Sequence, residues 1–435
     1  MALFSRRQCV VPLLFLSILC VVQPLHAADA QYTLSQAQQA LGSQSSIGLD
    51  EAIERAVGRS QALQAADNKA QVARLLSRAS LAGDDPVLNL SLTNLPINGA
   101  DAFSVGRDFM TMRSIGFMQT WVRQARRQAQ STVFASDEML ARVERAQQVS
   151  FIKTETAKAW FGQWLTAQML RSVEQQQQAL QLQLLGAKAG FESSTQSATD
   201  VLNANMALLE WQQLLASLEA QQDIAQHDLK RWVGTETRTA DFNPQRLTHT
   251  QWRMDSLMTD IEQVPELTMA QQSIAKAQAQ LALSRESLEP DWTYSVMLSA
   301  RGPQYSDMLT VGASRPLLWN TDEKQALAVE AQQAGVLQMQ AEYLELQRRL
   351  QHSVERRLIQ YNSLLTQWTI AKESILPLAK AVSQQAQADY ASGKITLTTL
   401  ANARREALNA ELNSLRQQLE LALAWAELQY LTAQE

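Results

Sequence analysis

The chain has 435 residues, of which 46% are hydrophobic and 19% charged, and its formal net charge is −5. This mild acidity gives no support to nucleic-acid binding, which needs a basic face. With only 15 glycines and 10 prolines over this length, long helices are favoured over a β-sandwich or a doubly wound sheet.

The N-terminus has the three parts of a secretory signal peptide. A basic start at Arg6 and Arg7 precedes a largely apolar run over residues 10–22, and small residues suited to cleavage follow at Ala27, Ala28 and Ala30. We expect a signal peptide over 1–28 and export of the remainder. Cleavage would remove both cysteines. Lipidation of Cys20 is the alternative, although the bulky Leu19 stands where a small residue is usual.

The first helix is predicted to begin at Gly48-Leu-Asp-Glu-Ala52, with Asp50 as its N-cap, and to run to about Leu81. A β-hairpin follows over about 86–121. Its first arm alternates Leu88, Leu90 and Leu92 with Asn89, Ser91 and Thr93, which is the period of a strand. The second arm, from about Met110 to Trp121, alternates less cleanly.

Long helices and a second copy of this pattern follow. We expect a helix over about 123–188, a return helix over about 195–232, and a linker over 236–263. The pattern then repeats with a helix at 265–288, a hairpin at about 290–319, a long helix at 321–390 and a return at 396–431. Pro377 should kink the second long helix. The offset of about 200 residues indicates a duplicated half rather than a solenoid unit.

The order of these elements resembles the TolC outer-membrane efflux family. The sharpest points are the two helix re-entries, Phe191-Glu-Ser-Ser-Thr-Gln-Ser-Ala-Thr-Asp-Val-Leu-Asn-Ala204 and Tyr390-Ala-Ser-Gly-Lys-Ile-Thr-Leu-Thr-Thr-Leu-Ala-Asn-Ala403. Pro86 and Pro290, each heading a strand after a helix, also fit. The hairpin sequence from Asn94 to Gln119 most resembles the heavy-metal-efflux branch of that family. The repeats would be residues 29–235 and 264–435.

The resemblance implies a mainly α fold with a small β part. Duplicated helix–hairpin–helix halves would build a long α-helical coiled-coil barrel below a twelve-stranded outer-membrane β-barrel, shared by three protomers. Membranes exclude open sheet edges, so four strands alone could not span one. Lipid-facing residues would be Leu88, Leu90, Leu92, Trp292, Tyr294, Val296 and Leu298; lumen-facing residues would be Asn89, Ser91, Thr93, Arg113, Thr293 and Ser295. Trp121, Trp292 and Trp319 would suit an interfacial belt, with packing against helices as the alternative.

The resemblance also implies a periplasmic gate at the helix re-entries. Asp200 and Tyr390 match the family's gate residues, whereas Ile395 stands in place of its arginine, beside Lys394. Thr399 and Asn402 occupy its usual acidic positions. We therefore expect Asp200 to pair with Lys394 or Tyr390, the alternative being a solvated Asp favoured near a helix start.

Two further residues of the re-entries are given a structural role. Gly393 should allow a tight turn, and Ser194 stands at the equivalent place in the first repeat.

Enzyme and metal signals are weak. The three histidines beyond the signal peptide, His227, His249 and His352, lack ligand-spaced partners, and no phosphate loop or nucleophile elbow occurs. Neither a cofactor nor a catalytic residue is expected. The sulfurs of Met110, Met112 and Met118 are soft ligands of the kind that bind copper or silver. Methionines in a strand more often fill apolar space, and that is the role expected of these three. Arg123, Arg126 and Arg127 are expected on a solvated or headgroup-facing surface.

The resulting prediction is the homotrimeric outer-membrane channel of a tripartite efflux system, with a long periplasmic part. It would conduct substrate passively, metal ions being favoured, from an inner-membrane pump of the proton-driven RND type and a periplasmic adaptor. Drug efflux or type I secretion is the alternative within this class. From another class, a soluble periplasmic coiled-coil adaptor would explain the helices but not the hairpins, and a secreted enzyme is a distant third.

Overall fold

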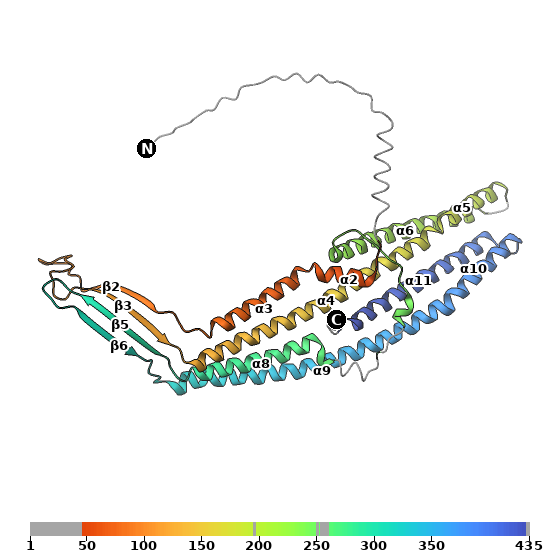
Figure 1. The fold of residues 1–435 in the computed structure, drawn as a ribbon. Coiled ribbons are helices and arrows are strands. Elements are labelled where there is room, and N and C mark those ends of the chain that lie inside the picture. The colour runs from red at the N-terminus through yellow and green to blue at the C-terminus, as the bar shows by residue number, and fades with distance from the viewer. Residues whose placement is uncertain (1–45, 195–196, 249–251, 253–260, 432–435) are drawn as a thin grey trace, which may run out of the picture. The chain divides into compact units, whose positions relative to one another are not determined.

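The computed structural model describes residues 46–194, 197–248, 252 and 261–431. The expected signal peptide over 1–28, with Cys20, lies outside the described residues, as do parts of the expected linker at 249–251 and 253–260. The described elements all belong to one unit, Ser46–Glu435. Helices make up most of it, and a four-stranded sheet is joined to their ends (Figure 1).

The first half of the described chain runs through two short helices, a hairpin, and a long helical excursion that returns. The elements in order are β1 (Ser46–Ile47), α2 (Leu49–Gly58), α3 (Gln61–Ala79), β2 (Val87–Thr93), β3 (Met112–Trp121), α4 (Gln124–Glu174), α5 (Gln177–Glu192) and α6 (Ala198–Val233). A connecting segment follows, with β4 (Arg238–Thr239) and the 3-10 turns η1 (Pro244–Leu247) and η2 (Ile261–Gln263).

The second half repeats this order. Its elements are α8 (Pro265–Glu286), β5 (Trp292–Ala300), β6 (Met308–Ser314), the π-helical turn η3 (Thr321–Ala326), α9 (Leu327–Ile370), the π-helical turn η4 (Ala371–Ile375), α10 (Leu376–Ala391) and α11 (Leu397–Gln429). Helix α4 packs against α3, α6, α8 and α11, while α9 packs against α8 and α11. The predicted succession of helix, hairpin, long helix and return is therefore present twice.

The first helix differs from the prediction at its start and in its middle. Gly48, not Asp50, is the N-cap residue, and Asp50 lies in the first turn. The predicted single helix is broken after Gly58, and Ser60 caps the new helix α3 by accepting a hydrogen bond from the Leu63 amide at 3.4 Å. At the break, Arg59 donates to the carbonyls of Arg231 and Trp232 at 3.0 and 3.1 Å, so the interruption places a cation at the end of α6.

The first long helix is also interrupted, at Gln175 and Gln176 between α4 and α5. In a continuous helix the Gln177 amide would bond to the Val173 carbonyl. That carbonyl accepts from the Gln176 amide at 3.1 Å, one residue early, and from the indole Nε1 of Trp211 at 2.9 Å. The helix tightens by one residue at this point, and a side chain from the return helix α6 bonds to the same carbonyl, which is a recognised feature of helix interruptions.

In the second long helix the interruption lies where Pro377 predicted it. The turn η4 immediately precedes α10, and Pro377 occupies the first turn of α10. Proline has no amide hydrogen and its ring crowds the carbonyl four residues earlier, so the local hydrogen bonding changes.

The largest hydrophobic cluster is aromatic and unites both halves. Trp160, Phe161 and Trp164 of α4 contact Phe242, and Phe161 also contacts Trp425 of α11. The expected linker over 236–263 contributes to this core, because Phe242 and Leu247 are buried. Strand β4 in that segment pairs in parallel with β1. Its described part is therefore a structural component rather than a free connection.

Candidate functional site

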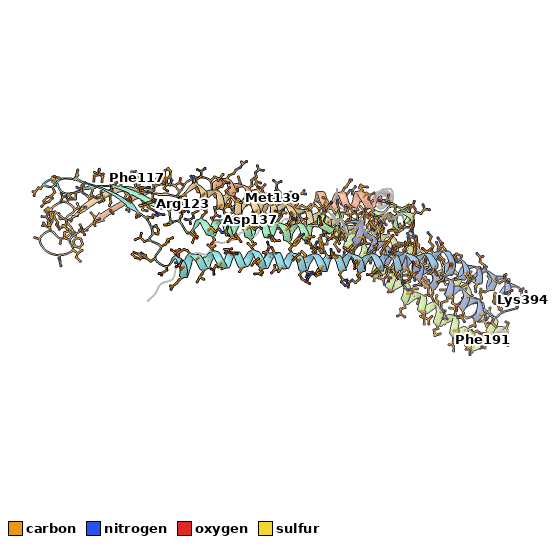
Figure 2. The ribbon with its side chains drawn as sticks, turned by 90° about the horizontal axis from the view of Figure 1, so that it is seen from below. Phe117, Arg123, Asp137, Met139, Phe191 and Lys394 are labelled. Carbon is orange, nitrogen blue, oxygen red and sulfur yellow. The ribbon has the colours of Figure 1, made fainter. Side chains whose placement is uncertain are left out.

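The two hairpins form one antiparallel sheet with the strand order β2-β3-β5-β6. Strands β3 and β5 are central, whereas β2 and β6 are edges with no partner among the described strands. Open edges present unpaired backbone groups and favour pairing with another chain. Figure 2 labels Phe117 in this sheet and, at the far ends of the helices, Phe191 and Lys394 beside the two turns.

The register gives the sheet one apolar face, because directly paired residues share a face. This apolar face contains Leu88, Leu90, Leu92, Ile115, Phe117, Trp121, Trp292, Tyr294, Val296, Leu298, Leu309 and Val311. Nothing in the described chain covers it: Leu90 is 68% exposed and Val311 71%. So large an apolar patch indicates a partner surface or a lipid environment.

The predicted grouping of Arg113 is wrong. Arg113 pairs with Leu92 and therefore shares the apolar face, opposite to Asn89, Ser91 and Thr93. It stands at the loop end of β3, where its guanidinium donates to the Arg301 carbonyl at 2.9 Å. The strand does alternate, but Arg113 and Gln119 stand at positions of its apolar face.

The opposite, polar face carries hydroxyls, small residues and methionines. Its members are Val87, Asn89, Ser91, Thr93, Met112, Ser114, Gly116, Met118, Thr120, Thr293, Ser295, Met297, Ser299, Met308, Thr310, Gly312 and Ser314. Two cross-strand hydroxyl pairs bridge β3 and β5: Ser114 with Ser299 at 2.8 Å and Thr120 with Thr293 at 3.1 Å. The face can therefore hydrogen-bond to water, and no carboxylate lies on it.

Tryptophans lie at the end of the sheet nearest the helices. Trp121 and Trp292 are directly paired across β3 and β5, and Trp292 stacks on Tyr294 with ring centroids 6.2 Å apart. Trp319, beyond β6, is 84% exposed. None of the described helices covers Trp319, so burial against them, the alternative explanation, does not account for it.

The arginines after β3 form an ion-pair network rather than a free surface. Arg126 pairs with Asp291, whose side chain is only 7% exposed, and the Arg123 amide donates to Asp291 Oδ1 at 3.0 Å. Arg123 also pairs with Glu286 and Glu289 at 3.1 and 2.7 Å. These contacts connect the start of α4 to the end of α8 and the start of β5. Arg126 keeps 46% of its side chain exposed, as expected of a solvated surface. Arg123, at 27%, lies within the network instead, and Arg127 donates to the Leu81 carbonyl at 2.7 Å.

At the far end of the helices, the turn between α10 and α11 contains Gly393, which ends α10. Gly393 has φ +73°, and two backbone bonds close the turn: Lys394 N–H to the Asp389 carbonyl at 2.9 Å and Gly393 N–H to the Tyr390 carbonyl at 3.0 Å. This is a Schellman motif, in which glycine adopts the left-handed conformation without strain. The predicted turn at Gly393 is confirmed. Ser194 has φ +60° at the equivalent position.

Asp200 does not pair with Lys394 or Tyr390 in this chain. Its Oδ2 accepts from the amide and hydroxyl of Ser197 at 3.0 and 2.8 Å, and the two residues form a capping box at the start of α6. Its Oδ1 accepts from Thr398 Oγ1 at 2.8 Å. The Thr398 and Ser197 hydrogen bonds hold the pKa of Asp200 below its ordinary value. Lys394 instead pairs with Asp389 at 3.8 Å.

Two residues of the second turn, Tyr390 and Ile395, make apolar contacts. Tyr390 and Ile395 are partly buried against a small cluster formed by Ala187, Ala204, Ala386, Leu397, Leu400 and Ala403. Thr399 contributes to the cap of α11, where its amide donates to Thr396 Oγ1 at 3.3 Å. Ile395, at the position of the family's arginine, is therefore part of the packing between the two helix returns.

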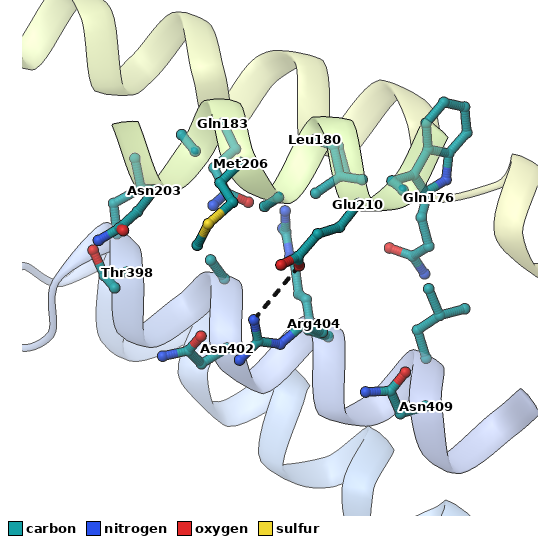
Figure 3. A pocket seen from close by; sticks show the side chains of 18 of the residues that line it. Gln176, Leu180, Gln183, Asn203, Met206, Glu210, Thr398, Asn402, Arg404 and Asn409 are labelled. Atoms are coloured by element: carbon teal, nitrogen blue, oxygen red, sulfur yellow. Dashed lines mark ion pairs between the residues drawn. The ribbon is translucent and has the colours of Figure 1, made fainter. Parts of the chain in front are cut away.

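A groove of about 480 Å³ separates these two returns and is lined by α5, α6 and α11 (Figure 3). Asn402, Asn203 and Asn409 lie along it, and Glu210 of α6 faces Arg405 of α11 with an N–O distance of 3.9 Å. Sequence reasoning missed Thr398, Glu210 and Arg405, because nothing local shows that α6 and α11 lie opposite one another.

Over the described residues, no group of three or more His, Cys, Asp or Glu side chains could hold a metal ion. Within the same residues, none of the helices combines the length and apolarity needed to cross a membrane.

Comparison with known proteins finds similarity in sequence for the second half and in fold for nearly the whole chain. The family described as "Outer membrane efflux protein" matches residues 260–434. No curated protein matches the chain.

Three solved structures illustrate the shared fold. CusC, in a study of transmembrane channel formation, has a TM-score of 0.71 at 16% identity, covering 88% of this chain and 92% of that one. The Campylobacter jejuni CmeC outer membrane channel has a TM-score of 0.73 at 12% identity, covering 88% and 85%. The Neisseria gonorrhoeae MtrE outer membrane channel in its open state has a TM-score of 0.70 at 13% identity, covering 88% of both chains. The chain therefore has the fold of these outer membrane channels.

Proposed function

We propose that the chain belongs to the outer membrane efflux protein family and is the outer-membrane channel of a tripartite efflux system. The observation that carries this proposal is the sheet, which has two open edges, one exposed apolar face and one polar face. In water such a sheet would aggregate. In a membrane, further copies of the chain can close the sheet into a barrel, so that the backbone groups of the edge strands are hydrogen-bonded and the apolar face contacts lipid.

In this proposal three copies close a twelve-stranded barrel, as the resemblance to the TolC family favours. The apolar face points to lipid and the polar face lines the lumen. Arg113 stands at the loop end of the apolar face, where its long side chain can reach lipid headgroups. Trp121, Trp292 and Trp319 then mark the opposite interface, next to the helices.

The helices would extend into the periplasm, and their turns would meet a periplasmic adaptor and close the channel at rest. The gate region would comprise Asp200, Tyr390, Gly393, Lys394, Thr399 and Asn402. Conductance of Asp200→Ala in a planar bilayer tests this part: a raised open probability supports a gate role for Asp200, and an unchanged one removes it from the gate. The pump would be of the inner-membrane, proton-driven RND type, and the channel itself would be passive.

Metal ions are the proposed cargo, ahead of drugs or secreted proteins, on the resemblance of the first hairpin to the heavy-metal-efflux branch. The function is tested by carbonate extraction of membranes, followed by conductance measurements on the purified protein. We expect retention in the membrane pellet and stepwise channel conductance. Release into the soluble phase would contradict the proposal and favour a soluble coiled-coil adaptor.

A further inference from the structure

Arg315 is an exposed cation beside the apolar face of the sheet, at the end nearest the helices. It directly follows Ser314, the last residue of β6, which pairs with Thr293. Its guanidinium lies over the ring of Trp292, 5.5 Å from the ring centroid, and Trp292 belongs to the apolar face. Because an arginine is always charged in proteins, a cation in this position favours an anionic partner.

The described part of the chain does not supply that anion. No carboxylate among the described residues is paired with Arg315, whereas Arg123 and Arg126, at the same end of the sheet, both pair with Asp291. The paired residues of the apolar face include no Asp or Glu. The contact with Trp292 also turns the guanidinium toward β5, away from the open edge of β6 where a neighbouring copy would pair.

Aromatic side chains surround this cation. Trp121 is paired with Trp292 across β3 and β5, and Trp292 stacks on Tyr294. Trp319, which follows Arg315 along the chain, is 84% exposed. Tryptophan and tyrosine combine an apolar ring with a polar N–H or O–H group, so they suit the depth at which acyl chains meet headgroups.

The place of Arg315 along the strands agrees with the depth of lipid phosphates. On β3 the apolar face runs from Arg113 to Trp121, a length of about 27 Å at ~3.4 Å per residue. With strands tilted by about 40°, this is roughly 21 Å along the membrane normal, close to the ~25 Å apolar band of membrane barrels. Arg315 lies beside Trp292, which is level with Trp121. It therefore stands at the boundary of the band, on the side of the helices.

We propose that Arg315 and Trp292 bind the phosphate of an anionic phospholipid, such as phosphatidylglycerol, in the leaflet next to the helices. The inference rests on the proposed function, in which the apolar face contacts lipid. The guanidinium donates two hydrogen bonds to phosphate oxygens, and the ring of Trp292 holds it in place. The acyl chains lie along the exposed Leu309 and Val311 of the same strand.

Two features favour an anionic lipid over other sources of phosphate. A free phosphate ion would leave the apolar side chains next to it in water, whereas a lipid covers them. A zwitterionic headgroup would bring an ammonium group, for which the paired residues of this face offer no carboxylate.

Phosphatidylglycerol titration of the purified full chain in detergent, followed by native mass spectrometry, tests the site. We expect Arg315→Gln to bind the first phosphatidylglycerol per chain at least about tenfold more weakly than the parent. Arg315→Lys should fall between them, because it keeps the charge but cannot form the bidentate contact. Phosphatidylcholine should bind the parent and both variants alike. Arg349→Gln, at an exposed position of α9, is the matched control and should bind phosphatidylglycerol like the parent.

Equal phosphatidylglycerol affinity in the parent and Arg315→Gln would overturn the proposal, and Arg315→Lys decides the test in the same way if Arg315→Gln does not fold. Equal affinity of the parent for glycerol phosphate and for the lipid would show a site for free phosphate instead. Loss of trimers in Arg315→Gln with unchanged lipid binding would assign Arg315 to a contact with a neighbouring copy, and would overturn the lipid site.

The conductance of the same preparations is measured separately. A conducting parent whose lipid binding ignores the substitution of Arg315 refutes the site and leaves the channel intact. A parent without conductance refutes the channel, whatever lipid it binds.

Discussion

At the scale of single residues, Asp291 holds the connection between the sheet and the helices. Its carboxylate accepts from the Arg123 amide and pairs with Arg126, while its side chain is almost fully buried. Asp291→Asn removes the negative charge that pairs with Arg126, and it replaces one acceptor oxygen with an amide group that cannot accept a hydrogen bond. We expect a loss of about 1–3 kcal/mol in the free energy of unfolding, nearer the lower value because Arg126 is partly exposed. Thermal unfolding in detergent, followed by circular dichroism, measures it.

The matched control is Glu289→Gln in the same network. Glu289 also pairs with Arg123, but its side chain is 68% exposed, and exposed ion pairs contribute about 0–1 kcal/mol. Its thermal midpoint should stay close to that of the parent. If both variants lose the same stability, burial of Asp291 is not what makes this junction strong.

Asp200 allows a prediction about pH. Its hydrogen bonds to Thr398 and Ser197 depress its folded-state pKa below the ordinary 3.8. Folding therefore favours the carboxylate, and its stabilising effect is fully present above pH 3.8 and is lost as pH falls through the lowered pKa. In Asp200→Asn, amides at the start of α6 should exchange with deuterium faster than in the parent at pH 7, and this difference should vanish in acid below that pKa. Asp223→Asn, at an exposed position of the same helix, is the control, and a difference that persists unchanged in acid would contradict the account.

At the scale of elements, local patterns predicted more than contacts between distant segments. The strands and the turn at Gly393 could be read from alternation and from glycine, because their causes lie within a few residues. The indole of Trp211 bonds to a carbonyl at the break between α4 and α5, and the bond from Thr398 to Asp200 joins α11 to α6. Neither contact has a local signal. Arg113 was assigned to the polar face of the sheet because its side chain is charged. The strand register instead places it on the apolar face, opposite Leu92.

The two helix turns both have a residue in the left-handed conformation, but one is glycine and the other is serine, so substitutions at the two positions should change stability in opposite directions. Gly393→Ala places a Cβ at φ +73°, where left-handed backbone costs about 1–2 kcal/mol, so the variant should be less stable. Ser194→Gly relieves the same strain at φ +60° and should be more stable. Gly186→Ala is the control for glycine content, because nothing lies within 4 Å of its added Cβ and alanine stabilises helix interiors by about 0.5–1 kcal/mol. Protease cleavage rates at each turn report the effect, and a stabilising Gly393→Ala would contradict the assigned backbone strain.

At the scale of the whole molecule, the sheet is incomplete in one chain, because the edges β2 and β6 have no partner among the described strands. If three copies close the barrel, β2 of one protomer lies beside β6 of the next. Cysteine pairs that join Leu88, Leu90 or Leu92 to Val311 should then be cross-linked between chains by a short thiol-reactive linker, giving a ladder that ends at three chains on a denaturing gel. Ile115→Cys with Leu298→Cys is the matched control, since these residues pair within one chain and should yield only cross-linked monomer. The parent should give no ladder, and because a closed ring has no free edge, bands beyond the trimer would show that the edges join open chains of subunits rather than a barrel.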